Sequence, residues 1–187
     1  MFHDQYRVES ARCCGRDYGE SGMYLVTVCT KDRRHWFGEV MSERMILNPV
    51  GMIVVEEILR TPFLRNNVVI ESWIVMPNHV HVIVEIVPRE TMDAVETHCQ
   101  CVSSDITKLI PFFRRKQGSL GAIVCRIKSD ATKRIWAAGY SDFRWQPRFY
   151  DSILRTDRSV DNVRSYIGMN PIMWDRDRNN SEDQETH

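Results

Sequence analysis

The sequence has no long apolar run, and this absence excludes membrane-spanning proteins first. Its longest run, Val82 to Val87, is interrupted by Glu85, whereas a transmembrane helix needs about 20 apolar residues. The N-terminal residues also lack the apolar stretch of a signal peptide. We therefore expect a cytoplasmic protein that has no membrane partner.

Cysteine spacing typical of zinc sites is also missing. Structural zinc sites use two well-separated pairs, usually Cys-x2-Cys, whereas Cys13 and Cys14 are adjacent and Cys99 and Cys101 form Cys-x-Cys. The chain also lacks the framework spacing of small disulfide-rich proteins, so free thiols are expected. A glycine-rich loop of the Walker type is absent, which excludes P-loop nucleotide hydrolysis. The six cysteines are Cys13, Cys14, Cys29, Cys99, Cys101 and Cys125.

The charge balance has no excess of either sign, because 25 Lys and Arg match 25 Asp and Glu. Their distribution is uneven: residues 107–174 hold 13 Lys and Arg against 5 acids. A basic half fits a polyanionic partner on one face. An ordinary solvated surface explains the same count equally well, so charge alone leaves both interpretations open.

The length of 187 residues and the 43% of apolar residues predict one domain with an ordinary core. We expect a polar N-terminal arm over residues 1–22 and a domain over residues 23–174. A polar, disordered tail is expected over residues 175–187. A surface insertion is expected near residues 91–104.

Periodicity predicts the main elements of this domain. Strands are expected over residues 23–30, 68–76 and 79–87, the last two joined as a hairpin by the turn at Pro77 and Asn78. Helices are expected over 48–59, ended by Pro62, over 119–136, and over 159–169 with Asp157 or Ser159 near the N-cap. Residues 137–150 are expected to form an aromatic loop. This order predicts an α+β fold, with one antiparallel sheet and helices packed on it.

Two histidines stand two residues apart in the strand predicted over 79–87. Side chains i and i+2 of a strand share a face, so His79 and His81 form half of a metal site. Val80, Val82 and Val84 fill the opposite face. A bare His-x-His pair is more often two ordinary histidines, and only its context favours a site.

Tyr166 and Asn170 lie four residues apart in the last predicted helix and so share one helical face. Asn170 offers a carbonyl oxygen to a hard cation, and Tyr166 offers a phenolic oxygen. Taken alone, the two residues are better explained as a buried tyrosine and an asparagine that ends a helix before proline.

The histidine pair and the Tyr166–Asn170 pair, together with the sequence around them, resemble the insertion-sequence-type single-tyrosine transposases of the HUH class. The resemblance is closer still to the REP-associated tyrosine transposases. The segment WIVMPNHVHVIVEI (Trp73 to Ile86) is similar to the family's His-hydrophobic-His signature. Four further blocks follow the family's order: YLVTVCTKDRRHWFGEV (Tyr24 to Val40), SLGAIVCRIKSDATKRI (Ser119 to Ile135), WQPRFYDSILR (Trp145 to Arg155) and YIGMNPIMW (Tyr166 to Trp174). The resemblance covers most of residues 23–174.

The resemblance implies a ferredoxin-like antiparallel sheet with the histidines on a central strand. It implies Mg²⁺ or Mn²⁺ held by His79, His81 and Asn170. The nucleophile is expected to be Tyr166, with Tyr150 as the alternative. The expected reaction nicks and rejoins single-stranded DNA with hairpin structure through a 5′-phosphotyrosine, without ATP.

Further expectations concern partners. Association with the nucleoid is expected, as is a monomer or a homodimer. Two other functions stay open: a domesticated binder that grips repeat-derived hairpins without cutting them, and a His-x-His metallohydrolase acting on a small molecule. The candidate DNA contacts are Lys128, Lys133, Arg134, Arg144, Trp145 and Arg148.

Overall fold

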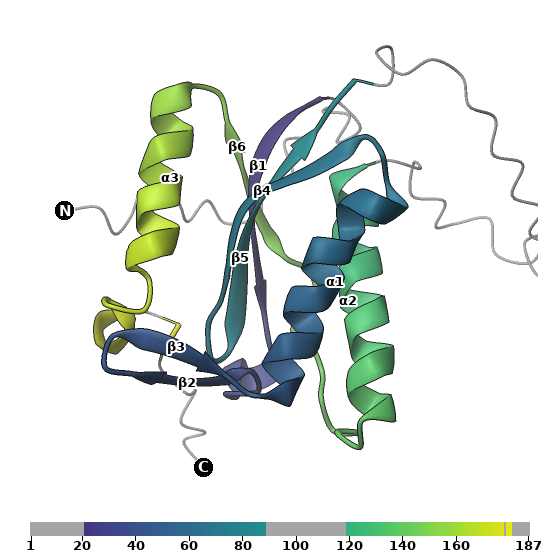
Figure 1. Ribbon diagram of the computed structural model, residues 1–187, viewed down its shortest axis with the longest axis vertical. Coiled ribbons are helices and arrows are strands. Elements are labelled where there is room, and N and C mark those ends of the chain that lie inside the picture. The colour runs from purple at the N-terminus through teal and green to yellow at the C-terminus, as the bar shows by residue number, and fades with distance from the viewer. Residues whose placement is uncertain (1–20, 89–118, 178, 181–187) are drawn as a thin grey trace, which may run out of the picture.

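The computed structural model describes residues 21–88, 119–177, 179 and 180. Figure 1 shows a central sheet with two helices on one side and one helix on the other. The predicted arm, apart from its last two residues, lies outside the described part, as does the predicted insertion near 91–104. Four of the six cysteines lie there too. Of the two described cysteines, Cys29 is buried and Cys125 is exposed, and no disulfide joins them.

The sheet has four strands in the order β4-β5-β1-β6, and all neighbours are antiparallel. Its strands are β1 (Gly22–Cys29), β4 (Val68–Val75), β5 (His79–Ile86) and β6 (Tyr150–Leu154). With the helices, the chain runs strand–helix–strand–strand–helix–strand, which is the ferredoxin-like order. The predicted α+β fold is therefore confirmed, with β5 in a central position. The helices are α1 (Pro49–Leu64), α2 (Leu120–Ala137) and α3 (Asp157–Met169).

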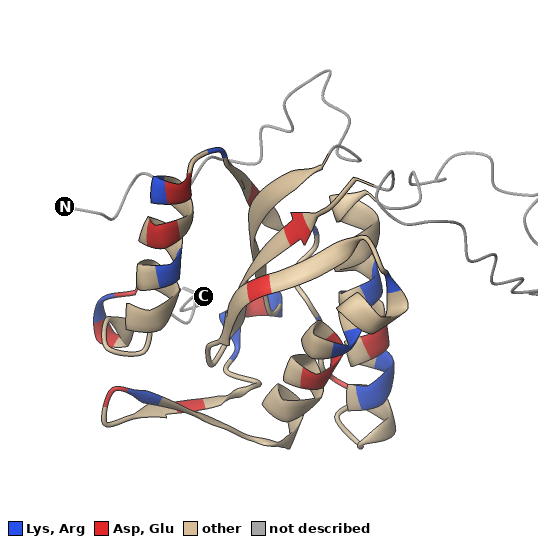
Figure 2. Cartoon of the chain, turned by 45° about the horizontal axis from the view of Figure 1, so that its top comes forward, with Lys and Arg blue, Asp and Glu red and all other residues tan. Residues whose placement is uncertain are grey.

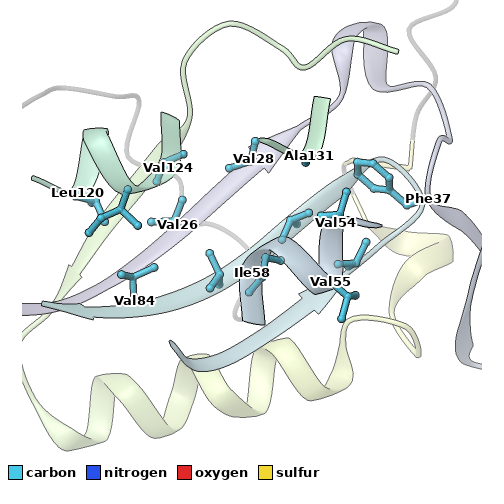
Figure 3. Packing of buried hydrophobic residues seen from close by; sticks show 14 of the residues in the cluster. Val26, Val28, Phe37, Val54, Val55, Ile58, Val84, Leu120, Val124 and Ala131 are labelled. Carbon is cyan, nitrogen blue, oxygen red and sulfur yellow. The ribbon is translucent and has the colours of Figure 1, made fainter. Parts of the chain in front are cut away.

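The larger core lies between the sheet and helices α1 and α2. Figure 3 shows valines of the sheet meeting Val54 and Ile58 of α1 and Leu120 and Val124 of α2. A smaller cluster on the opposite face joins Leu25, Ile83 and Leu154 of the sheet to Val160, Val163 and Ile167 of α3. Both faces of the sheet are thus covered. None of the helices in the described ranges is long and apolar enough to cross a membrane.

Helix α1 corrects the expected helix end at Pro62. Asn48 begins the helix, because its side chain accepts a hydrogen bond from the Gly51 amide at 2.9 Å. The helix then continues through Pro62 to Leu64. A proline in the last turn removes only one backbone hydrogen bond. Burial of Ile58 and Thr61 in the same part of the helix outweighs that loss.

Several short elements escape the sequence prediction. A two-stranded hairpin, β2 (Gly38–Met41) and β3 (Arg44–Leu47), follows the charged turn η1 (Lys31–Arg33). Strand β6 begins at Tyr150, inside the segment expected as loop. These pieces are too short to show a period in the sequence.

The C-terminal part brings two more corrections. Helix α3 is capped by Thr156, not by Asp157 or Ser159, and Thr156 and Ser159 form a capping box. The expectation of disorder from Asp175 onward is wrong for the first residues of the tail, which form the short helix η3 (Trp174–Arg176). The buried Trp174 ring anchors this turn.

Replacement of two helix glycines by alanine is expected to change the free energy of unfolding in opposite directions. An added Cβ at Gly51 would lie 2.3 Å from the Phe37 carbonyl oxygen, whereas at Gly121 it would meet nothing within 4 Å. We expect Gly51→Ala to lower the free energy of unfolding by about 1–3 kcal/mol through overpacking. Gly121→Ala should raise it by about 0.5 kcal/mol, because alanine loses less backbone entropy on folding. Urea unfolding of both variants measures the difference, and equal effects would contradict the close approach at Gly51.

Candidate active site

The two histidines of β5 lie in the interior, on the face of the sheet that α3 covers. Their valine neighbours Val80 and Val82 point into the larger core on the other face, as the alternation predicts. His79 is 0% exposed and His81 4%, and their ring centroids are 4.6 Å apart. The pair thus occupies a shared, water-poor position at the start of the central strand.

Helix α3 brings Tyr166 and Asn170 to these histidines. The Tyr166 hydroxyl lies 3.3 Å from Nε2 of His81, and the two ring centroids are 5.3 Å apart. Asn170, the C-cap residue, is 2% exposed, and its side chain hydrogen-bonds to Tyr166. The structure therefore unites the four residues that the sequence singled out.

Two residues that the sequence analysis missed lie within hydrogen-bond distance of the imidazoles. The Thr27 hydroxyl lies 2.8 Å from Nδ1 of His81, and the Asn78 amide oxygen lies 2.9 Å from Nδ1 of His79. Asn78 directly precedes His79 in the turn, so the sequence alone could have indicated that the two side chains lie close together. Thr27 lies on β1, opposite His81, and only the strand register reveals it.

Two buried polar atoms in this site have no hydrogen-bond partner among the described residues: Nε2 of His79 and Oδ1 of Asn170. A buried polar atom without a partner costs free energy. An imidazole nitrogen and an amide oxygen are both ligands for divalent cations, so the residues fit a metal ion. In the described ranges no three His, Cys, Asp or Glu side chains gather in this way, so the donor set here is two imidazoles and an amide.

Burial controls the protonation of the site. Desolvation, with smaller contributions from Arg33 and His35, lowers the pKa of His79 to about 3. Desolvation and then His79 lower the pKa of His81, against an opposing effect of Asp177. Both imidazoles are therefore neutral at pH 7, the form that ligates metals.

The pKa of Tyr166 shifts the other way. Desolvation and then the negative charge of Asp177 raise the pKa of its phenol, and the hydrogen bond from Asn170 opposes them. The phenol is therefore protonated in the free protein. Its ionisation requires positive charge nearby.

The turn after α3 closes the site on the His79 side. The Trp174 ring lies 6.0 Å from the His79 ring and 5.6 Å from the His35 ring. No role is predicted from the sequence for His35, Trp174 or Asp177. The chain folds back toward the histidines after Pro171, and no periodicity or residue spacing in the sequence predicts this reversal.

Tyr150, the alternative nucleophile, occupies a different place. It begins β6 and stands opposite Thr27, so it shares the histidine face of the sheet. Thr27 lies between Tyr150 and His81 in the register. Of the two tyrosines, Tyr166 is the one in contact with a histidine of the pair.

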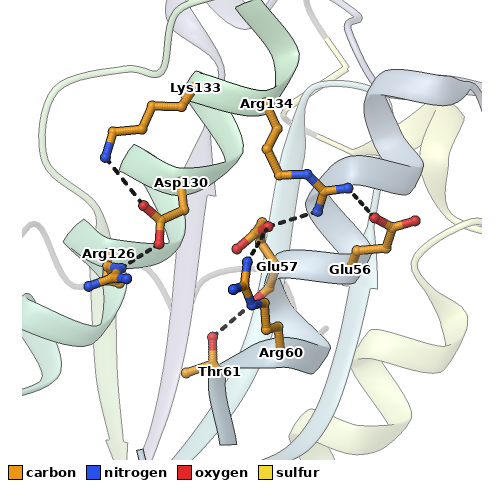
Figure 4. Close-up of polar contacts among 8 residues, drawn as sticks. All are labelled: Glu56, Glu57, Arg60, Thr61, Arg126, Asp130, Lys133 and Arg134. Atoms are coloured by element: carbon orange, nitrogen blue, oxygen red, sulfur yellow. Dashed lines mark hydrogen bonds and ion pairs between the residues drawn. The ribbon is translucent and has the colours of Figure 1, made fainter. Parts of the chain in front are cut away.

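Three of the candidate DNA contacts lie on α2, which packs on the sheet face opposite the histidines. Figure 4 shows the Arg134 guanidinium paired with both Glu57 and Glu56. Its separation from the Glu57 carboxylate is 2.7 Å. Lys133 lies 3.6 Å from Asp130. Lys128 donates to the backbone carbonyls of Gln146 and Arg148, at 2.8 and 2.9 Å.

The other three candidates follow α2. Arg144 stacks over the Trp136 ring at 4.6 Å and donates to the Phe143 carbonyl at 2.7 Å. Trp145 packs between aromatic rings of the core. Arg148 is exposed, has a positive φ of 68°, and has no ion-pair partner in the described part of the chain.

Charges of both signs are interspersed over the helices, as Figure 2 shows. Among the described residues, the basic surplus counted in the sequence therefore does not produce a uniformly basic helix face. Cations of α2 are neutralised by acids of α1 and of α2 itself.

Comparison with known proteins gives consistent matches. The sequence model of the family described as "Transposase IS200 like" matches residues 20–118. An uncharacterized protein of Haemophilus influenzae is 30% identical over 164 residues, which cover 87% of each chain. The chain is also similar to a solved structure of the REP-associated tyrosine transposase bound to a REP hairpin, and the match covers 85% of this chain and 72% of that one. Its TM-score of 0.53 and 19% identity show a shared fold.

The depressed pKa of His79 predicts an acid-sensitive stability. Between pH 6.5 and about 3, the unfolded chain carries a proton on this imidazole that the folded chain does not. Stability should therefore fall as the pH falls below 6.5, by at most about 1.4 kcal/mol per pH unit for this group. Urea unfolding above and below pH 6.5 should show a flatter dependence for His79→Asn than for wild type. Asn48→Ala, which removes a helix cap and no histidine, should keep the wild-type slope.

Because Glu57 is buried, we expect its partner Arg134 to contribute more to stability than the neighbouring Lys133. Its side chain is 2% exposed, and Arg134 is its closer partner, with Arg60 at 3.8 Å. Arg134→Met should destabilise the fold by about 2–3 kcal/mol, because it leaves a buried carboxylate poorly paired. Lys133→Met, at a side chain 73% exposed, should change the free energy by less than about 0.5 kcal/mol. Similar losses in thermal or urea unfolding would count against this assignment.

Proposed function

The chain belongs to the family of IS200-like transposases, and from this premise we propose that it nicks and rejoins single-stranded DNA. Tyr166 is the nucleophile in this proposal. His79, His81 and Asn170 hold a divalent cation, Mg²⁺ or Mn²⁺. The REP-associated tyrosine transposases are the relatives whose chemistry this site fits best.

One observation carries the proposal: two buried, unpartnered ligand atoms lie in the same site as a tyrosine hydroxyl. The Asn170 amide oxygen is unpartnered, so this side chain bonds to Tyr166 through its amide nitrogen, which donates to the phenolic oxygen. The phenol then has its own proton to donate to Nε2 of His81. Ligand atoms and nucleophile are therefore already adjacent before any DNA binds.

The reaction is a phosphoryl transfer that conserves bond energy. The phenolic oxygen of Tyr166 forms a bond to phosphorus, the bond to the 3′ oxygen breaks, and a 5′-phosphotyrosine and a free 3′-hydroxyl result. The phenol loses one proton and the leaving oxygen takes one up. When bound, a divalent cation stabilises negative charge on the phosphate and favours the phenolate. Rejoining reverses these bonds and needs no ATP.

The residues of the chain set up this transfer. Asn170 donates a hydrogen bond that favours the phenolate, against the effects of burial and Asp177. The neutral imidazoles of His79 and His81 present nitrogen lone pairs at pH 7. Trp174 shields the histidine pair from water on one side.

Single-stranded DNA with hairpin structure is the proposed substrate. The similar solved structure is of a protein bound to a REP hairpin, which supports this choice. Among the predicted DNA contacts, the exposed Arg148 is the most available cation. Tyr166 meets His81 of its own chain, which supports a site that one monomer completes.

The reaction is tested by covalent capture. Wild type with Mn²⁺ and end-labelled hairpin DNA from the repeats flanking its gene should give a protein–DNA adduct on a denaturing gel. Tyr166→Phe and His79→Ala should reduce the adduct by at least about 100-fold, because nucleophile and metal ligand are lost. Tyr150→Phe is the matched control and should retain it.

Other outcomes have distinct meanings. Loss of the adduct in Tyr150→Phe, with Tyr166→Phe active, transfers the nucleophile to β6. Hairpin binding with no adduct in any variant, including wild type, favours the domesticated binder.

A further inference from the structure

We infer that Asn78 is a positioning residue, which fixes the tautomer and orientation of His79 so that its Nε2 lone pair faces the site. The inference rests on the proposed function in one respect: the role of His79 as a metal ligand. The tautomer itself is a property of the free protein.

The Asn78 side chain is held so that it cannot turn over. It is 0% exposed, and its amide nitrogen donates to two backbone carbonyls, Arg33 at 2.9 Å and Asn179 at 2.6 Å. Both N–H donors are therefore used, and turning the amide over would bring its oxygen against two carbonyl oxygens. The backbone of Asn78 is held too, since the Thr30 amide donates to its carbonyl at 2.8 Å.

This fixed orientation determines which nitrogen of His79 carries the proton. The amide oxygen of Asn78 lies 2.9 Å from Nδ1 of His79. An amide oxygen only accepts hydrogen bonds, so Nδ1 must donate. In the neutral imidazole the proton is then on Nδ1, and Nε2 carries the lone pair. Nε2 is the buried atom without a partner, as a ligand atom should be.

Asn78 also connects His79 to two segments far away in sequence. One of its partners belongs to the turn after β1 and the other to the segment after η3. The same C-terminal segment brings Trp174 against the His79 ring. The hydrogen bonds that orient the histidine therefore depend on the return of the chain after the tyrosine helix. The residue that orients a metal-bound histidine commonly affects metal affinity.

The first test needs no metal. In metal-free wild type, ¹⁵N chemical shifts of the imidazole should identify His79 as the Nδ1–H tautomer. In Asn78→Ala the Nε2–H form should appear, because nothing then selects Nδ1. A wild-type His79 protonated on Nε2 would overturn the inference.

The second test measures Mn²⁺ binding by calorimetry, without DNA. Asn78→Ala should bind about 10- to 100-fold more weakly than wild type. Asn48→Ala is the matched control: it removes an asparagine that also bonds to two backbone groups, but it is not a partner of His79, so it should bind like wild type. Equal affinities of Asn78→Ala and wild type would overturn the positioning role and leave the proposed function intact. A wild type that binds no Mn²⁺ would instead refute the metal site.

Discussion

The alternation of side chains along β5 is the constraint on which the site depends. One face of this central strand sends Val80, Val82 and Val84 into the core under α1 and α2. The other face holds His79 and His81 beneath α3. A shift of one residue in strand register would exchange the two sets, burying imidazoles among valines. Because the valine face packs densely on two helices, the register is fixed, and the position of the histidines follows from it.

Burial of the histidine pair has two consequences that depend on each other. The interior removes water and keeps both imidazoles neutral. It also leaves each polar atom in need of a partner. Thr27 and Asn78 provide partners for the two Nδ1 atoms, whereas Nε2 of His79 and Oδ1 of Asn170 stay unpaired. The free energy lost on these two atoms is a local cost of folding that a bound cation would relieve, and sites built for ligands often carry such costs.

The sequence was sufficient for features that repeat at short range, and insufficient for contacts between distant segments. The period of two in HVHVIV placed His79 and His81 on one face, and the spacing of four joined Tyr166 to Asn170. No local pattern could pair Thr27 with His81 across β1 and β5, or return Trp174 to His79 after Pro171. The limit is physical, since tertiary packing and register decide these contacts after the local elements have formed.

The pairing of the basic side chains is also decided by contacts between distant segments, and it reduces the number of cations that are available to the proposed DNA substrate. The basic residues of α2 and of the loop after it look available in the sequence. In the structure, Arg134 pairs with the buried Glu57, Lys128 donates to two backbone carbonyls of the loop before β6, and Arg144 of that loop is stacked on Trp136. A DNA strand that drew Arg134 away would leave the buried Glu57 carboxylate with Arg60 at 3.8 Å as its partner, at a cost of about 2–3 kcal/mol. Contact with Arg148, which has no ion-pair partner among the described residues, breaks no such pair. Arg148 also lies two residues before β6, whose first residue faces the same side of the sheet as the histidines. For the proposed DNA substrate, contact at this edge of the sheet would therefore leave the ion pairs of α2 intact, whereas contact through Arg134 would break one.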